Sequence, residues 1–161
     1  MKFLKVLDAA ERYVVAVLTV GLTLTVFFQI LNRGIFKMNL AWPEEAARYM
    51  MVWMIFMASV LGFKRGANIG IDIITSRMKG AWAKIFFVIQ GGVTMAFAGI
   101  VAWYSMPIIQ MQFELNQRSP ALKLNMSYVY SAMPVWGALI IIEIGAALFI
   151  ALRSREGENK A

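Results

Sequence analysis

The stretch that decides the fold is Trp42-Pro43-Glu44-Glu45-Ala46-Ala47-Arg48-Tyr49, which runs directly into the apolar run Met50-Met51-Val52-Trp53-Met54-Ile55-Phe56-Met57. Proline has no backbone donor to lose at the first helical position, and carboxylates in the first turn face the positive end of the helix dipole. We therefore expect a helix that starts at Pro43 and enters a membrane. Arg48 follows Glu44 by four residues and Glu45 by three, so it lies on the same helix face within reach of both.

The composition is that of an integral membrane protein. Of the 161 residues, 60% are hydrophobic and 16% are charged, and the mean hydropathy is +0.65. Sixteen Lys and Arg residues against nine Asp and Glu residues give a net charge of +7, but these charges crowd the ends of apolar runs, which argues against a nucleic-acid partner. The chain has no Cys and no His, which excludes disulfides, thiolate or imidazole metal ligands and a His-ligated haem. A redox membrane subunit is therefore not expected, and we expect no metal and no cofactor.

Four apolar segments are long enough to cross a bilayer, because about 20 helical residues span a hydrocarbon core of about 30 Å. The sequence predicts an all-α integral membrane fold of one domain, residues 1–161, with transmembrane helices at about 13–35, 43–63, 82–112 and 127–152. The third segment is longer than the bilayer requires, so it must tilt, protrude or bend, and Pro107 is the expected place for a bend or an end. The tail from Arg153 onward is expected to be disordered.

Two segments have the pattern of short interfacial helices. Residues 2–12 place apolar side chains on one helical face, and residues 70–80 in the second loop space their apolar residues similarly. The alternatives are a solvated extension of the first spanning helix and ordinary turn structure. The basic start resembles that of a signal peptide, but Asp8 and Glu11 interrupt it and no cleavage site follows, so we expect it to be retained.

The basic residues predict the orientation in the membrane. Eleven of them lie in the N-terminus, the second loop and the C-terminus, against four in the first and third loops and Arg48 just inside the second helix. Basic residues are enriched in cytoplasmic segments, so both termini and the second loop are expected in the cytoplasm. Residues 42–48 and the Arg118-Ser119-Pro120 loop then face the outside, which in a Gram-negative bacterium is the periplasm.

Glu143 is the ionisable residue placed well inside a predicted spanning segment. A charge there costs about 2.5 to 3.5 kcal/mol on insertion scales, which the surrounding Leu and Ile residues roughly offset. Gln90 lies at a similar depth in the third helix and is a candidate hydrogen-bond partner. Glu143 then serves either as a proton or cation relay or as a packing contact, between helices or with a partner subunit.

Two stripes of residues at helical spacing have structural interpretations. Met50, Met54 and Met57 form a flexible apolar stripe, which is more typical of a core or a lipid-facing surface than of a recognition site. Gly92, Ala96 and Gly99 form a small-residue stripe that lets another helix approach closely, and packing inside this subunit is the favoured interpretation.

Features of a complete transporter are missing from the sequence. Transporters commonly hold solute and ions between paired helices broken by Gly or Pro, within internal repeats, and neither pattern is evident here. An accessory subunit is therefore favoured, although small dimeric transporters built on one membrane glutamate remain an alternative.

Several motifs along the chain resemble those of a known family. Residues 42–49 resemble the Trp-x-Glu-Glu-x-x-Arg signature of the small, four-helix (Q-type) membrane subunit of tripartite ATP-independent periplasmic (TRAP) transporters. The resemblance covers most of the chain, from Tyr13 to Leu152, and Asn68 departs from it where many members have a His. The agreeing landmarks are Asn32-Arg33, Lys64-Arg65, Asn68-Ile69-Gly70-Ile71-Asp72, Ser119-Pro120-Ala121-Leu122, Tyr128 and Met133-Pro134.

The resemblance implies a division of labour between three proteins. A periplasmic binding protein captures an organic acid, of the dicarboxylate or sialic acid type, and a large multi-helix subunit moves it with a sodium gradient. The small subunit braces that large subunit in the bacterial inner membrane as a non-catalytic scaffold, with its apolar faces, the methionine stripe among them, against the large subunit. The residues implied in subunit assembly are Trp42, Glu44, Glu45, Arg48, Tyr49 and Trp53, and those implied in docking of the binding protein are Arg118 and Ser119.

Two other functions compete with this interpretation. The first is an autonomous small transporter that exchanges protons for solute through Glu143. The second is a structural or assembly factor of another membrane complex.

Overall fold

The fold is entirely helical in the part of the chain that the structure describes. The computed structural model covers residues 2–38, 40–75 and 81–158. Among these residues, four segments are long and apolar enough to cross a membrane, namely Leu4–Phe36, Trp42–Phe63, Val88–Glu114 and Ser127–Leu148, which confirms the predicted fold class. The helical elements are α1 (Lys2–Leu31), the π-helix η1 (Asn32–Phe36), α2 (Trp42–Thr75), α3 (Ala81–Glu114), α4 (Ser127–Tyr130) and α5 (Ala132–Glu158).

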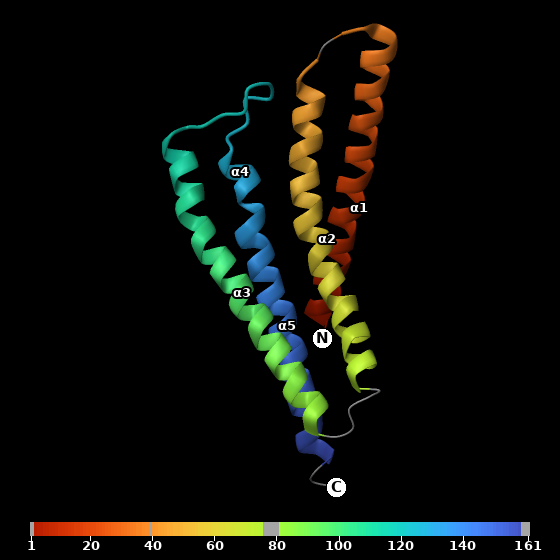
Figure 1. Ribbon diagram of the computed structural model, residues 1–161, viewed down its shortest axis with the longest axis vertical. Helices are drawn as coiled ribbons and strands as arrows, with labels where there is room; N and C mark the ends of the chain where they lie inside the picture. The colour runs from red at the N-terminus through yellow and green to blue at the C-terminus, as the bar shows by residue number, and fades with distance from the viewer. Residues whose placement is uncertain (1, 39, 76–80, 159–161) are drawn as a thin grey trace.

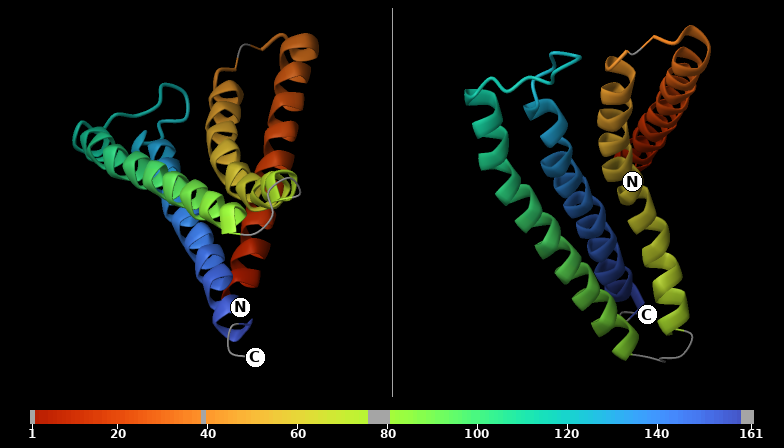
Figure 2. Two further views of the ribbon diagram at one scale, coloured as in Figure 1. Left: turned by 60° about the horizontal axis from the view of Figure 1, so that its bottom comes forward. Right: turned by 45° about the horizontal axis from the view of Figure 1, so that its top comes forward.

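The spanning helices form two antiparallel hairpins. α1 packs along α2, α3 packs along α5, and contacts between α2 and α5 join the two hairpins (Figure 1). The turn after α1 and residues 115–126 lie at one end of the bundle, which we call the loop end. The start of α1 and the end of α5 lie toward the opposite end (Figure 2). α2 is therefore the central helix, with α1 on one side and the second hairpin on the other.

Three helices are longer than the sequence predicts. α1 runs unbroken from Lys2, so residues 2–12 extend the first spanning helix and do not form a separate interfacial helix. α2 continues to Thr75, so residues 70–75 also belong to a spanning helix, while the remainder of the second expected interfacial segment lies outside the described residues. α5 continues to Glu158, where the sequence predicts a disordered tail. Once a helix exists, each added residue gains a hydrogen bond, and Arg and Glu are good helix formers.

Prolines have different effects in α3 and in the last span. α3 passes through Pro107 and ends only at Glu114, so this proline does not terminate the helix. In the last span, Pro134 has no N–H to donate to the carbonyl of Tyr130 four residues earlier. The helix is interrupted there, at Ser131, between α4 and α5. The predicted fourth helix is therefore one apolar span, Ser127–Leu148, with a local break in its hydrogen bonding at Ser131, where the dihedral angles stay helical.

A buried asparagine closes the turn between α1 and α2. Asn32 is only 5% exposed, and its Nδ2 donates a hydrogen bond of 3.1 Å to the carbonyl of Met38. The Met38 N–H returns a 3.4 Å bond to the Asn32 carbonyl. This pair of bonds brings the chain back toward the start of α2.

The core lies where α2, α3 and α5 meet. Trp136 of α5 packs between two phenylalanine rings, with centroid distances of 5.9 Å to Phe56 and 6.2 Å to Phe97. Its indole N–H donates to the hydroxyl of Ser59 at 2.6 Å, so the polar edge of a buried ring is satisfied. The buried residues of this cluster are Val60, Ala98, Trp136 and Ile140.

The small residues that allow close helix packing are not the predicted stripe. A methyl group added at Gly137 of α5 would lie 2.8 Å from the Ala98 carbonyl oxygen of α3, so the two backbones approach closely there. At Gly92 and Gly99 an added methyl group would meet no atom within 4 Å. The expected packing of the Gly92, Ala96 and Gly99 stripe inside this subunit is therefore wrong, because α3 turns a different face toward α5.

Substituting Gly137 by alanine is expected to destabilise the chain. The new methyl group would clash with the backbone of α3, and such overpacking costs about 1 to 3 kcal/mol. The measurement is the thermal unfolding midpoint of the purified chain in detergent. Gly99→Ala is the matched control, and it should leave the midpoint unchanged or raise it slightly, because alanine favours helix. Equal midpoints for the two variants would contradict the close approach.

The methionine stripe of α2 packs inside the chain. The sulfur of Met54 accepts a 3.5 Å hydrogen bond from the Thr19 hydroxyl of α1, and the sulfur of Met50 lies 3.2 Å from the Cβ position of Gly21. Met57 is 4% exposed. Two of these methionines thus contact α1 and the third is buried, as the core interpretation predicts.

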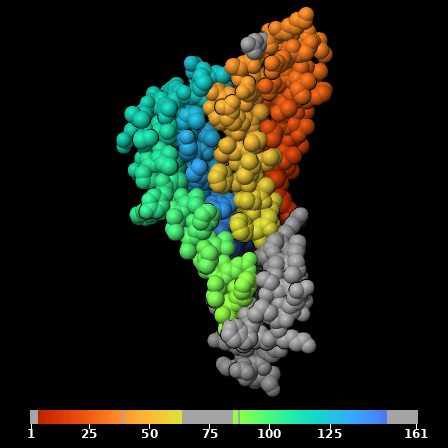
Figure 3. Space-filling view, in the orientation of Figure 1, coloured from red at the N-terminus to blue at the C-terminus, as the bar shows by residue number. Residues whose placement is uncertain are grey.

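Figure 3 shows how the helices cover one another on one face. The side chains of α5 fill the space between α3 and α2, and residues of the 115–126 segment meet the start of α2 at the loop end. Large apolar side chains remain exposed over much of α1 and α3, as expected for helices that face lipid or another subunit.

Candidate functional site at the start of α2

The start of α2 forms as its sequence predicts. The helix begins at Trp42, Pro43 is fully buried in its first turn, and Glu44 and Glu45 follow in the same turn. The Glu45 N–H donates to the Ala41 carbonyl at 3.3 Å. A proline without an N–H and two carboxylates at the positive end of the dipole both favour a helix start here.

Glu44 and Arg48 form the exposed part of the site. A 3.1 Å ion pair joins Arg48 to Glu44 four residues earlier, and the two side chains are 66% and 63% exposed. This contact confirms the pairing that the spacing predicts for Glu44. An exposed pair of this kind contributes only about 0.3 to 0.5 kcal/mol to helix stability, so both groups can exchange partners at little cost.

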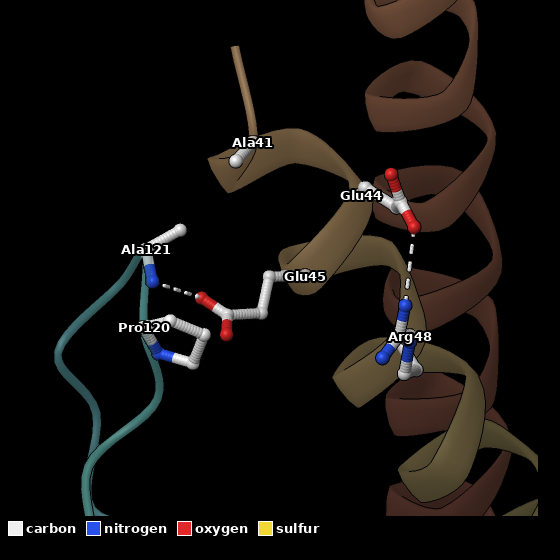
Figure 4. A pocket seen from close by; sticks show the side chains of 6 residues that line it. All are labelled: Ala41, Glu44, Glu45, Arg48, Pro120 and Ala121. Atoms are coloured by element: carbon white, nitrogen blue, oxygen red, sulfur yellow. Dashed lines mark hydrogen bonds and ion pairs between the residues drawn. The ribbon is translucent and has the colours of Figure 1, made fainter.

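Glu45 has a different environment from its neighbour. It is 8% exposed, and its Oε2 accepts hydrogen bonds from the backbone N–H groups of Ala121 at 3.0 Å and Leu122 at 2.7 Å. Its Oε1 accepts a 3.1 Å bond from the Tyr49 hydroxyl. Figure 4 shows this carboxylate pointing at the loop, away from Glu44 and Arg48. Glu45 therefore ties α2 to the loop after α3.

The loop that receives Glu45 is a closed turn. The Ser119 N–H donates to the Leu124 carbonyl at 2.8 Å, and the Lys123 N–H donates back to the Ser119 carbonyl at 3.1 Å. The Ser119 hydroxyl accepts a further 3.3 Å bond from the Leu124 N–H. This turn leaves the successive N–H groups of residues 121 and 122 facing one point, an arrangement that binds anions.

A shallow cavity of about 320 Å³ lies between the charged start of α2 and this loop. Figure 4 shows the Glu45 carboxylate directed at Ala121, and the Glu44 and Arg48 pair on the other side of the helix start. The lining residues are Ala41, Glu44, Glu45, Arg48, Pro120 and Ala121. The described residues contain no group of three or more His, Cys, Asp or Glu side chains that could hold a metal ion. The lining holds no nucleophile activated by a base, so the arrangement supports structural contacts rather than covalent chemistry.

Aromatic residues continue the contact between α2 and the second hairpin below Glu45. The Tyr49 hydroxyl lies 3.4 Å from the sulfur of Met126, and the Trp53 indole N–H donates to the Tyr128 carbonyl of α4 at 3.2 Å. Trp42 instead faces α1, with its ring centroid 5.6 Å from that of Phe28.

The residues expected to contact partners fall into two groups. Trp42, Glu44 and Arg48 are exposed, whereas Glu45, Tyr49 and Trp53 use their polar atoms inside the chain. In the loop, Arg118 is exposed and its Nε donates to the Asn116 side chain at 3.2 Å. Ser119 is 1% exposed, so a partner would reach its side chain only if the loop opened.

The intramembrane polar residues lie far from this site. Glu143 is half-buried in α5, one position before Ile144, whose side chain contacts the Gly91 position of α3. Gln90 is exposed on α3, next to Gly91. A hydrogen bond between Glu143 and Gln90 stays a prediction.

Comparison with known proteins identifies the family. Residues 22–154 match the family described as the DctQ component of tripartite ATP-independent periplasmic transporters. The chain belongs to this family. DctQ components are transporter subunits, so the chain is a membrane-embedded subunit of a secondary transporter and not an enzyme.

Three relatives illustrate the range of the family. The C4-dicarboxylate TRAP transporter small permease protein DctQ of Rhodobacter capsulatus is 24% identical over 183 aligned positions, which cover 95% of this chain and 81% of the relative. The protein of the same name from Vibrio cholerae is 24% identical over 83% of this chain and 67% of its own length. The isethionate TRAP transporter permease protein DctMQ of Oleidesulfovibrio alaskensis is 31% identical over 64% of this chain, but the match covers only 16% of that longer protein.

Proposed function

We propose that this chain is the non-catalytic scaffold subunit of a sodium-driven, binding-protein-dependent transporter that imports an organic acid across the inner membrane of a bacterium. The main support is the similarity to the DctMQ permease, in which a DctQ-like segment and a much longer permease share one polypeptide. A segment fused to a permease in one protein is expected to bind a separate permease subunit in another. The proposed stable partner is therefore a large multi-helix transport subunit.

The proposed substrate class follows from the relatives. Their names specify a C4-dicarboxylate and isethionate, and both are small organic anions. A dicarboxylate or a sialic acid belongs to the same class. In this proposal the substrate contacts lie on the large subunit and on the binding protein.

The continuity of the helices supports a bracing role. Transport subunits commonly hold solute and ions at helices broken in mid-membrane, where free backbone groups are available. Across the described residues, the spanning helices are continuous apart from the break at Ser131 near the loop end. A rigid set of continuous helices can brace a moving partner without binding its substrate.

In the proposed orientation the candidate site would lie on the outer side of the membrane. The excess of basic residues at the opposite end favours cytoplasmic termini, so the loop end would face the periplasm. We propose that Trp42, Glu44 and Arg48 contact the large subunit directly and that Glu45, Tyr49 and Trp53 support that contact from within. Arg118, with Ser119 behind it, would lie where the binding protein docks transiently.

Reconstitution in proteoliposomes tests this function. The purified chain alone should import no radiolabelled succinate, isethionate or N-acetylneuraminate under a sodium or proton gradient. Import should require a large subunit and a binding protein of the same transporter. Gradient-driven uptake by the chain alone that is abolished by Glu143→Gln would overturn the proposal in favour of an autonomous transporter. Stable co-purification with an unrelated membrane complex would instead indicate an assembly factor.

A further inference from the structure

The two adjacent glutamates of the start of α2 have opposite surroundings. Glu44 is exposed and paired with Arg48, whereas Glu45 is buried and bonded to the loop after α3. We infer that Glu45 is an internal positioning residue, which fixes residues 115–126 against α2 through hydrogen-bond geometry and makes no contact with a partner subunit.

The hydrogen bonds of Glu45 support this role. One oxygen, Oε2, accepts both loop N–H groups, from Ala121 at 3.0 Å and from Leu122 at 2.7 Å. The other oxygen is engaged by the Tyr49 hydroxyl. Both oxygens are thus occupied within the chain, and a carboxylate that accepts several N–H bonds in a partly dry site gains little from a further partner.

The loop depends on this contact because its own bonds do not attach it to α2. The bonds around Ser119 close the turn on itself. Among the hydrogen bonds of the described residues, those that join residues 115–126 to α2 come from Glu45 and from Tyr49, which interacts with the Ser119 hydroxyl and weakly with the Met126 sulfur. Removing the Glu45 side chain would therefore leave the turn folded but held to α2 only through Tyr49, which is too little to fix its position.

The consequence for transport rests on the proposed function. If the binding protein docks on the loop end, then the position of the exposed Arg118 is set from α2 through Glu45. Losing this support should weaken docking without changing the transport step itself, because Arg118 and the docking surface remain chemically intact.

Three variants separate hydrogen-bond geometry from charge. Glu45→Gln keeps the length, since its carbonyl oxygen can accept both loop N–H groups while its amide donates to Tyr49. Glu45→Asp keeps the charge but withdraws the carboxylate by about 1.5 Å, one carbon–carbon bond. Glu45→Ala removes both the hydrogen-bond acceptor and the charge. Glu44→Ala is the matched control on the neighbouring exposed residue.

The first measurement is a distance between the loop and α2 in the full chain. The chain has no Cys, so cysteines introduced at the exposed positions Met51 and Leu124 can carry a pair of spin labels. Pulsed electron paramagnetic resonance should give a narrow distance distribution in the labelled chain without further substitution, in Glu45→Gln and in Glu44→Ala. Glu45→Asp and Glu45→Ala should give a broad one. A narrow distribution in Glu45→Ala, or a broad one in Glu45→Gln with a narrow one in Glu45→Asp, would overturn the inference.

The second measurement uses the assembled transporter in proteoliposomes. With uptake normalised to the amount of assembled complex, the binding-protein concentration for half-maximal uptake should rise several-fold in Glu45→Asp and Glu45→Ala and stay unchanged in Glu45→Gln. Arg118→Glu should cause a similar rise while leaving the distance distribution narrow. If the distribution broadens as expected but neither Arg118→Glu nor Glu45→Ala changes the concentration dependence, the docking role fails and the positioning role of Glu45 stands.

Discussion

Replacing Trp136 by alanine is expected to lower the free energy of unfolding of the chain by about 3 kcal/mol. The indole is 6% exposed and joins α5 to α2 through Phe56 and through its bond to Ser59. The value lies at the low end for a buried Trp because the separated helices would still be in apolar lipid, so part of the transfer free energy is not lost. Denaturant unfolding of the purified chain in detergent, followed by circular dichroism, measures the loss.

Two further variants test the cause of that loss. Ser59→Ala removes only the acceptor of the indole N–H and should cost about 1 kcal/mol. Trp103→Ala removes an indole that is 76% exposed and should cost much less than Trp136→Ala. Similar losses from the two tryptophans would mean that the core is not centred on Trp136.

Reversing the charge of Arg48 is expected to prevent assembly with the large subunit. Arg48→Glu replaces the 3.1 Å pair with Glu44 by two like charges on an exposed helix face, which costs the helix only a few tenths of a kcal/mol. The chain should therefore fold normally, but the partner would meet a repulsive, strongly acidic surface at the edge of the membrane. Co-purification of the tagged chain with the large subunit, from a strain that expresses both, measures this effect.

The chain offers a matched control for this reversal at its opposite end. Arg12 forms an ion pair with Asp8 at the same four-residue spacing in α1, so Arg12→Glu makes the same change in helix chemistry. It should leave co-purification unchanged. If both reversals reduced the amount of co-purified large subunit equally, the effect would reflect general destabilisation. If Arg48→Glu left co-purification unchanged, Arg48 would not be part of the interface.

The sequence was sufficient to predict the spanning helices and the start of α2. Hydrophobic length decides which segments cross a bilayer, and the Pro43 and Glu44 signals act within one helical turn. Hydrophobic length and helix-start signals both depend only on residues that are close together in the sequence. The extension of α1 back to Lys2 and the break at Ser131 were missed because helix continuation depends on cooperativity and on a single missing N–H, which the apolar pattern does not reveal.

The sequence could not predict which helix faces pack together. A helix in a membrane is apolar on all sides, so the periodicity that identifies the buried face of a soluble helix is weak. The stripe of Gly92 and Gly99 therefore looked as suitable for close packing as Gly91 and Ala98, which actually face α5. Only the positions of the neighbouring helices decide between them.

The role of Glu45 was missed for a related reason. Its spacing to Arg48 suggests a local ion pair, whereas its hydrogen-bond donors are backbone groups of Ala121 and Leu122, which carry no side-chain signal. The Ser119-Pro120 turn was recognisable in the sequence, but a turn does not indicate what it binds. The match between a buried carboxylate and a pair of backbone donors appears only in three dimensions.

The hydrogen bonds along α2 restrict how this bundle can change shape. Glu45, Trp53 and Ser59 bond at successive heights to the loop, α4 and α5. Packed helices commonly adjust by sliding along one another, and a slide of one turn moves a helix by about 5.4 Å. Such a slide would break the contacts at all three heights together, and at depths within the membrane lipid offers no replacement partners. These contacts therefore oppose sliding of the second hairpin along α2, and we expect the two hairpins to keep their register.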